Sequence, residues 1–475
     1  MSKKNQNYTN RKQNRFQPER MRGNVFANNN GKRWMPGESG RAAKVERLLK
    51  GAKEEKKEIA GNMAGYKDSG IEYIGQVPKD WEVLRLKNIS NIYAAKEYLF
   101  GEWPVEKNGK PYSPFGEWSS GNEVIITGRV GTIGQYEMLE KNPKKKILIN
   151  DNRLLIRPFT EDYRKKALSH FLFWAMAIVN LNDIITGSAV PLITATSLLK
   201  KRIVVPPLPE QQRIADFLDT KCGILDHTID AVSRQIEDLE KYKKALITKT
   251  VTKGICKKGK PERAMKDSGV EWIGEVPEEW SIKPFKALAG MKGSSEYTAR
   301  DIVDEGEGAI LLSPSNINDN KLNLSKRTYI SQKKYDKSTT KIQRGDLLFT
   351  KTASVGKCVI YDSDEPAMPN PQLVVLKNIK CLPKFLYYSM VSDVIQAPAK
   401  MYVYGSVIPT ISQMNLGRIK IPVPSPEEQQ QIADYLDEKC KNIDNRVQKR
   451  KQQLEWLKKY KKSLIFDYVT GKKRV

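Results

Sequence analysis

The segment Pro209-Glu-Gln-Gln-Arg-Ile-Ala-Asp-Phe-Leu-Asp219 occurs twice in this chain. It returns 218 residues later, without a gap, as Glu427-Glu-Gln-Gln-Gln-Ile-Ala-Asp-Tyr-Leu-Asp437. Each copy follows a proline-rich segment, Pro206–Pro209 or Pro422–Pro426. Because proline fixes φ and is tolerated only in the first turn of a helix, each segment predicts the end of a strand followed by the start of a helix.

Apolar residues continue from both copies at steps of four and three, which is the seam of a coiled coil. Each predicted helix has about 40 residues and a length of ~60 Å. Two matched helices of this length in one chain predict a pair that lies against each other within the chain. In an antiparallel pair Cys222 and Cys440 would lie near opposite ends and form no disulfide. Lys243, Arg450 and Lys461 interrupt the seam, where a partner subunit or a buried carboxylate would meet them. The first seam comprises Ile214, Leu218, Cys222, Leu225, Ile229, Val232, Ile236, Leu239 and Leu246, and the second Ile432, Leu436, Cys440, Ile443, Val447, Leu454, Leu457 and Leu464.

A second repeat precedes each helix. Lys67-Asp-Ser-Gly-Ile-Glu-Tyr-Ile-Gly-Gln-Val-Pro-Lys-Asp-Trp81 is echoed 199 residues later by Lys266-Asp-Ser-Gly-Val-Glu-Trp-Ile-Gly-Glu-Val-Pro-Glu-Glu-Trp280. The chain is therefore two copies of one unit: an opening arm, a globular region and a long helix. The predicted divisions are a basic, disordered extension over 1–62, a first domain over 63–207, a central helix over 208–252, a linker over 253–265, a second domain over 266–424 and a C-terminal helix over 425–475.

The globular regions have the composition of mixed α/β domains, so the expected fold class is α+β with an internal pseudo-two-fold repeat. In the first we predict strands over 81–86, 123–126, 132–138 and 147–156 and a helix over 164–185. In the second we predict strands over 309–312, 346–350, 357–361 and 372–376 and a helix over 383–395. Each domain closes with a related turn, Gly187-Ser-Ala-Val-Pro-Leu-Ile193 or Gly405-Ser-Val-Ile-Pro-Thr-Ile411, and a strand over 202–206 or 418–422.

The charge of the chain indicates a polyanionic partner. Lys and Arg outnumber Asp and Glu by 82 to 55 over 475 residues, a net charge of +27. A charge this high is typical of nucleic-acid binding, although a lysine-rich, solvated surface would give the same number. No apolar run reaches the ~18 residues of a membrane span, and no signal peptide is recognisable, so we expect a cytoplasmic protein. Five cysteines without Cys-x-x-Cys spacing predict neither a disulfide framework nor a zinc site.

The sequence lacks the motifs of a catalyst. It has two histidines, His170 and His227, which are too few for most acid–base or metal chemistry. The segment Lys351–Cys358 has Lys in place of the first glycine of a phosphate-binding loop and Cys in place of its Ser/Thr. There is no methyl-donor loop and no nuclease-like acidic cluster. We therefore predict that the chain is not an enzyme and holds no cofactor or metal.

Residue types that read DNA occur at matching places in both globular regions. Arg and Lys can bond guanine edges, Asn and Gln can bond adenine, and short hydroxyls suit bases or phosphates. The alternative is that these residues are the polar exposed parts of tight hairpins. The candidate DNA-binding residues are Thr127, Arg129, Thr132, Asn150, Asn152 and Arg153 in the first region and Lys351, Thr352, Ser354, Asn370 and Gln372 in the second.

Taken together, the paired arms, the two Gly-Ser-x-x-Pro turns and the two Glu-Gln-Gln-x-Ile-Ala-Asp segments resemble a type I restriction-modification specificity subunit over residues 63–471. That resemblance implies two target-recognition domains held apart by two helices in an antiparallel coiled coil. Each domain would read one half of a split double-stranded DNA sequence, and the helices would fix the spacer and dock two modification subunits. Those partners would use S-adenosylmethionine, and restriction subunits would use ATP with Mg.

Two other functions stay open at this stage. A self-contained DNA methyltransferase or nuclease is disfavoured by the missing motifs. A basic RNA-binding scaffold is disfavoured by the two-domain repeat, which suits the two-fold symmetry of duplex DNA.

Overall fold

The computed structural model describes residues 65–94, 106–107, 110–111, 124–128, 133–138, 153–159, 168–187, 190–255, 263–294, 296–405 and 408–475. The chain divides into two compact units, residues 1–67 and 68–475, and, apart from the first two residues of β1 (Tyr66–Asp68), all that follows concerns the second. The extension predicted over 1–62 lies outside the described residues. No helix in the described part of the chain is long and apolar enough to cross a membrane.

The first domain is built on an antiparallel sheet in the order β4-β9-β7-β8. The buried side chains of its strands, Val124, Ile126, Leu154 and Ile156, pack against α2 and the start of α4. Its elements are β1 (Tyr66–Asp68), β2 (Gln76–Pro78), β3 (Glu82–Arg85), β4 (Ser90–Ala94), β5 (Glu106–Lys107), β6 (Lys110–Pro111), β7 (Val124–Thr127), β8 (Tyr136–Met138), β9 (Arg153–Pro158), α2 (Ser169–Met176), α3 (Ala195–Leu199) and β10 (Arg202–Val205), which pairs with β3.

The helix predicted over 164–185 is much shorter than expected. Helix α2 ends at Met176, and only a 3-10 turn, Asn182–Ile184, follows. The side chain of Asn180 accepts a hydrogen bond from the backbone N–H of Asn182 at 3.1 Å, and such local bonds compete with the helix. The apolar run predicts one helix, but only its first part is helical, and its second part forms turns.

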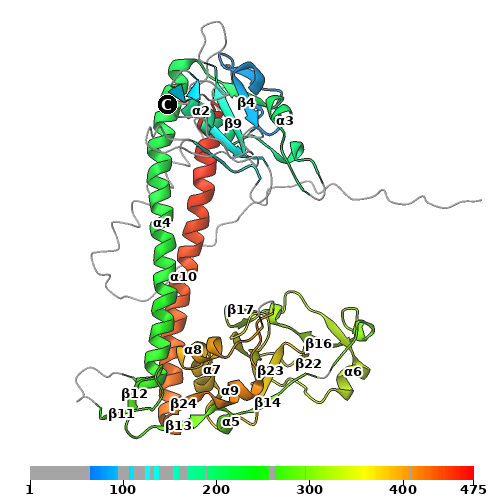
Figure 1. Ribbon diagram of the computed structural model, residues 1–475, viewed down its shortest axis with the longest axis vertical. Helices are drawn as coiled ribbons and strands as arrows, with labels where there is room; N and C mark the ends of the chain where they lie inside the picture. Colours follow the sequence, from blue (N-terminus) through cyan, green and yellow to red (C-terminus); the bar gives the residue numbers. More distant parts are fainter. Residues whose placement is uncertain are drawn as a thin grey trace, which may run out of the picture. The chain divides into compact units, whose positions relative to one another are not determined.

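The second domain has the corresponding sheet, β14-β23-β20-β21, and a second four-stranded sheet, β15-β19-β16-β22. Helices α7 and α9 cover the first of these sheets (Figure 1). Its elements are β11 (Met265–Asp267), β12 (Glu275–Pro277), β13 (Ser281–Pro284), α5 (Phe285–Leu288), β14 (Gly290–Lys292), β15 (Ile302–Val303), β16 (Gly308–Leu312), β17 (Ile317–Asn318), β18 (Lys321–Leu322), β19 (Tyr329–Ser331), α6 (Gln332–Lys337), β20 (Leu347–Thr350), β21 (Cys358–Ile360), β22 (Ala367–Pro369), β23 (Leu373–Lys377), α7 (Pro383–Val391), α8 (Asp393–Met401), α9 (Gln413–Arg418) and β24 (Lys420–Val423), which pairs with β13.

Two predictions in this domain need correction. The helix predicted over 383–395 is two helices, because Ser392 leaves the helical conformation and its hydroxyl caps α8 by accepting from the N–H of Val394 at 3.2 Å. The strand predicted over 418–422 begins at Lys420, because Arg418 closes α9.

The two long helices are α4 (Leu208–Lys253) and α10 (Pro426–Val469), which lie side by side in Figure 1. They run in opposite directions: Ile214 and Leu218 at the start of α4 share a core with Leu464 near the end of α10. Midway, the buried side chains of both helices meet in a cluster of Val232, Ile236, Ile443, Val447 and Leu457. At the far end, Ile247 and Val251 of α4 join Ile432 and Leu436 of α10 in the core of the second domain. Each domain is thus continuous with one end of the helix pair.

Candidate nucleic-acid interface

The turn between β20 and β21 presents three of the predicted DNA-binding residues, Lys351, Thr352 and Ser354, all half-buried. The N–H of Thr350 donates to the Lys357 carbonyl at 2.9 Å, and the N–H of Gly356 donates back to the Thr350 carbonyl at 3.0 Å. Ala353, at the tip, has φ +65°, a left-handed conformation that alanine seldom adopts. Such strain persists only where the surroundings fix the backbone, so this turn holds its side chains in set positions.

One glutamine ties this turn to the helices behind it. The Nε2 atom of Gln396 in α8 donates to the carbonyl oxygens of Gly356 and Met390, each at 2.7 Å. A side chain on Gly356, whose φ is +105°, would meet Gln396 at 2.5 Å. The turn therefore depends on a glycine and a glutamine that the sequence analysis had not singled out.

Asn370 and Gln372 lie beside the turn but differ in exposure. Asn370 is buried, with 7% of its surface exposed, and its amide bonds to Gln372 through Nδ2 to Oε1 at 3.2 Å and through Oδ1 to the backbone N–H at 3.0 Å. The carbonyl of Gln372 accepts from the N–H of Lys351 at 2.9 Å. Asn370 thus positions Gln372 next to Lys351, and Gln372 is the half-exposed member of the pair.

The first domain repeats the hydrogen bonds at the base of this turn around Thr127. Its N–H donates to the Gln135 carbonyl at 2.7 Å, and its carbonyl accepts from the N–H of Gly134 at 2.8 Å. Strand pairing places Thr127 opposite Arg153, so two of the predicted residues are neighbours. The other four, Arg129, Thr132, Asn150 and Asn152, lie outside the described residues.

A hairpin from the Gly-Ser-x-x-Pro segment joins each turn. In the second domain the N–H of Ala353 donates to the Pro409 carbonyl at 2.8 Å, and the N–H of Ile411 donates to the Lys351 carbonyl at 2.9 Å. In the first, the N–H of Ile193 donates to the Gly128 carbonyl at 2.7 Å. Two signatures that are over 50 residues apart in sequence thus form one surface in each domain. We name these surfaces reading surface 1 (Thr127, Gly128 and Val190–Leu192) and reading surface 2 (Lys351–Ser354, Gln372 and Ile408–Thr410).

The two sequence repeats also contact each other. The indole N–H of Trp81, from the first arm, donates to Glu210 Oε2 at 3.0 Å, and that of Trp280 donates to Glu428 Oε2 at 2.9 Å. Arg263 adds a second bond to Glu428 at 2.6 Å. Each arm is therefore fastened to the first turn of the helix that follows its own domain.

Other polar residues of the repeated segment form hydrogen bonds that anchor the first and second domains to the long helices. Gln211 accepts from the N–H of Leu168 at 2.9 Å and donates to the Pro206 carbonyl at 2.8 Å, and Gln429 does the same for Leu382 and Pro424 at 2.8 and 2.9 Å. Asp219 accepts from the Trp174 indole at 2.8 Å, as Asp437 does from the Tyr388 hydroxyl at 2.6 Å. Sequence reasoning missed these roles, although the repetition itself was the signal.

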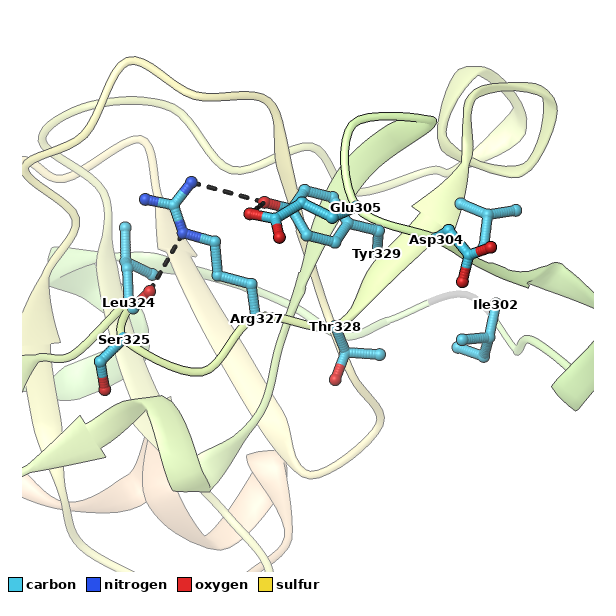
Figure 2. Close-up of a pocket in the computed structure, with 9 residues that line it drawn as sticks. Ile302, Asp304, Glu305, Leu324, Ser325, Arg327, Thr328 and Tyr329 are labelled. Atoms are coloured by element: carbon cyan, nitrogen blue, oxygen red, sulfur yellow. Dashed lines mark hydrogen bonds between the residues drawn. The ribbon is translucent and has the colours of Figure 1, made fainter. Parts of the chain in front are cut away.

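A polar pocket in the second domain is lined by Arg327, whose charge is paired with a carboxylate of the same chain. Figure 2 shows Arg327 beside Glu305 and Tyr329 in a pocket of about 530 Å³. The guanidinium bonds to Glu365 at 2.6 Å and to the Leu324 carbonyl at 3.0 Å. Because its charge is already paired, Arg327 is poorly suited to bind a phosphate.

The described residues include few groups suited to metal binding or nucleophilic chemistry. They contain no cluster of three or more His, Cys, Asp and Glu that could hold a metal ion. Burial raises the pKa of the Cys222 and Cys440 thiols to about 11, so neither is a ready nucleophile. His170 is bonded to Asp219 at 2.9 Å and serves the anchoring of its domain.

Comparison with known proteins agrees with this division into two similar halves. The family described as "Type I restriction modification DNA specificity domain" matches residues 78–241 and 277–456, well over half of the chain. The MjaVIII specificity subunit of a type I restriction enzyme from Methanocaldococcus jannaschii is 24% identical over 84% of this chain and 94% of its own length. The putative MjaX subunit from the same organism is 28% identical over 85% and 96%, and the EcoBI subunit from Escherichia coli is 23% identical over 78% and 81%.

A solved structure from a study of the assembly and conformational transition of the type I R-M system shares the fold. Its TM-score is 0.59 at 15% identity, over 84% of this chain and 99% of that one. Because the family model matches both halves and covers well over half of the chain, the chain belongs to the family of type I restriction-modification DNA specificity subunits.

Proposed function

We propose that this chain selects the DNA sequence for a type I restriction-modification complex by reading a two-part target, one half with each domain. Reading surface 1 would contact one half-site and reading surface 2 the other. In the second domain the residues that contact DNA would be Lys351, Thr352, Ser354 and Gln372, with Asn370 positioning Gln372. In the first domain they would be Thr127, Arg129, Thr132, Asn150, Asn152 and Arg153.

The observation that supports this most is the equivalence of the two reading surfaces. Thr127 and Thr350 occupy equivalent positions at the bases of equivalent turns, one in each domain. Each turn is bonded to the Gly-Ser-x-x-Pro hairpin of its own domain. Two copies of one reading device in a single chain are suited to two half-sites, which the approximate two-fold symmetry of duplex DNA presents in equivalent ways.

The helices act as the spacer in this proposal. We infer an antiparallel coiled coil with pseudo-two-fold symmetry, because two ion pairs across the helices, Lys243–Asp444 and Lys461–Asp226, join positions that the 218-residue repeat interchanges. From Gln211, which anchors the first domain, to Ile247 in the core of the second, α4 rises ~54 Å, about 16 base pairs of B-DNA. That separation leaves room for an unread segment between two half-sites.

The chemistry would come from partners. Members of this family are specificity subunits, and the catalytic activity of a type I system lies in other subunits. We propose two modification subunits docked on the helices, which use S-adenosylmethionine to methylate an extruded base, and restriction subunits that use ATP with Mg. This chain would determine which DNA sequence is bound and how far apart the two half-sites lie.

Exchange of one domain tests the proposal. Residues 83–190 would be replaced by the same segment of another specificity subunit with a known target, and the assembled complex would be offered a library of duplexes. We expect only one half of the selected sequence to change. A change in both halves would reject the assignment of one half-site to each domain, and methyl transfer by the purified chain alone would support an enzyme instead. Equal competition by RNA would favour an RNA-binding scaffold.

A further inference from the structure

The Gly-Ser-x-x-Pro hairpins carry an exposed apolar residue at the same place in both halves. Val190 has 54% of its surface exposed and Ile408 has 57%, and a proline follows each of them. The positions are related by the 218-residue repeat. A single exposed apolar residue on a surface is ordinary. Two branched apolar residues at equivalent positions, in domains whose middles have diverged, indicate a shared use.

Backbone hydrogen bonds flank these residues in each hairpin. The N–H and carbonyl of Thr186 pair with Leu192 at 2.9 and 2.8 Å, and those of Tyr404 pair with Thr410 at 2.9 Å in both directions. Gly187 and Gly405 have φ +90° and +93°. A Cβ on either would lie 2.4 or 2.6 Å from the carbonyl oxygen of Val190 or Ile408, so glycine is required for the turn. A side chain on so fixed a backbone can be presented to a partner with little loss of entropy.

The partner is indicated by what the hairpins are attached to. Ile408 lies one residue from Pro409, whose carbonyl accepts from Ala353 at the tip of the reading turn. Thr410 pairs with Thr352 in an isolated bridge. Any surface that meets Thr352 and Lys351 therefore comes close to Ile408. Proteins that deform DNA insert apolar side chains such as Ile and Pro into a groove between base steps.

We propose that Val190-Pro191 and Ile408-Pro409 are apolar DNA-contacting tips, one for each half-site, that pack into the groove beside the bases read by the adjoining turn. This inference rests on the proposed function and adds a contact of different chemistry to it. The turns supply hydrogen bonds and charge, and the tips supply apolar contact, which selects base steps by shape and deformability.

The test uses the complete complex of this chain with its modification subunits and a duplex carrying the mapped target. Val190→Asn and Ile408→Asn are compared with the wild-type chain, with Ile408→Leu as the conservative variant. Ile302→Asn is the matched control, because Ile302 is an exposed isoleucine of the same domain on a strand away from the hairpin. Affinity is measured for the intact target and for targets with either half scrambled, at several salt concentrations.

We expect each Asn variant to bind the intact target about tenfold more weakly, as loss of one buried aliphatic contact implies. Scrambling the half-site that the mutated tip contacts should then reduce the affinity by a smaller factor than in the wild-type complex. The salt dependence of the affinity should stay unchanged because no phosphate contact is lost. Ile408→Leu and Ile302→Asn should bind like the wild type. Wild-type affinity in both Asn variants overturns the inference, and so does failure of either variant to assemble with its modification subunits, which would make the hairpin a protein interface. If the wild-type complex itself ignores half-site scrambling, the proposed function fails first.

Discussion

The ammonium group of Lys243 lies 2.7 Å from Oδ1 of Asp444, across the seam between α4 and α10. Its counterpart Lys461 lies 2.6 Å from Asp226, so the same bond is made twice in opposite directions. The first pair is partly shielded, with side-chain exposures of 29% and 32%, whereas in the second Lys461 is 25% and Asp226 54% exposed. Lys243 and Lys461 therefore meet carboxylates within this chain, but neither carboxylate is buried as the sequence analysis expected. Arg450, which also interrupts the seam, donates to Gln453 Oε1 at 2.7 Å instead.

A double-mutant cycle on Lys243 and Asp444 should give a coupling free energy of about 1 kcal/mol, the upper end for partly exposed pairs. The measurement is urea unfolding of Lys243→Ala, Asp444→Ala and the double variant. Arg344 and Asp364 form a matched control pair at 62% and 77% exposure, for which we expect coupling near zero. Equal coupling free energies in the two pairs would show that placing an ion pair at the seam does not strengthen it.

Glu210 should matter for stability because it is a buried carboxylate in the first turn of α4. Glu210→Ala removes the acceptor of the buried Trp81 indole, and an unsatisfied buried donor costs about 1–3 kcal/mol. Glu210→Gln keeps an oxygen that can accept the bond and should cost less. Urea unfolding followed by tryptophan fluorescence compares the two, and an identical loss in both variants would mean that the hydrogen bond is unimportant.

The buried thiols should lower the free energy of unfolding at alkaline pH. Burial raises the pKa of Cys222 and Cys440 from 9.0 to about 11. Since the folded pKa lies above the unfolded one, this contribution to stability is complete below pH 9 and is lost as pH rises to about 11. The free energy of unfolding should fall over that interval, and less so in a Cys222→Ala/Cys440→Ala variant. A double variant with the same pH dependence would exclude the thiols as the cause.

Lengthening both helices should lengthen the spacer of the target. A seven-residue insertion after Arg234, paired with one after Gln453, preserves the heptad register. The two sites face each other: Arg234 lies nine residues before Lys243, and Gln453 lies nine residues after Asp444. The added rise is ~10 Å, or about three base pairs. Selection from a duplex library should yield both half-sites unchanged with the longer gap. Insertion into one helix alone misaligns the ion pairs and serves as the control; an unchanged gap after the double insertion would refute the spacer role.

The heptad pattern and the proline-rich segments were enough to predict the two long helices, because both signals are local. The contacts of Glu210, Gln211 and Asp219 could not be predicted, since their partners lie up to 129 residues away in sequence. The helix expected to reach Ile185 stopped at Met176 because a side-chain bond of Asn180 outweighs an apolar run.

For the candidate site, residue type identified the turn of reading surface 2 but could not show that Asn370 is buried behind Gln372. Nor could it show that the Gly-Ser-x-x-Pro hairpin is bonded to that turn, because the bond between Ala353 and Pro409 joins two segments that no local pattern connects. The repeat showed that both segments matter, and only the fold brought them together.

Mapping methylated bases in DNA from cells that carry this chain with a modification subunit tests the central claim most directly. The comparison is with cells that carry the modification subunit alone. We predict methylation confined to one two-part sequence with an unread gap of constant length. Methylation at an uninterrupted sequence, or the same pattern without this chain, would contradict the conclusion that its two domains read two halves of one target.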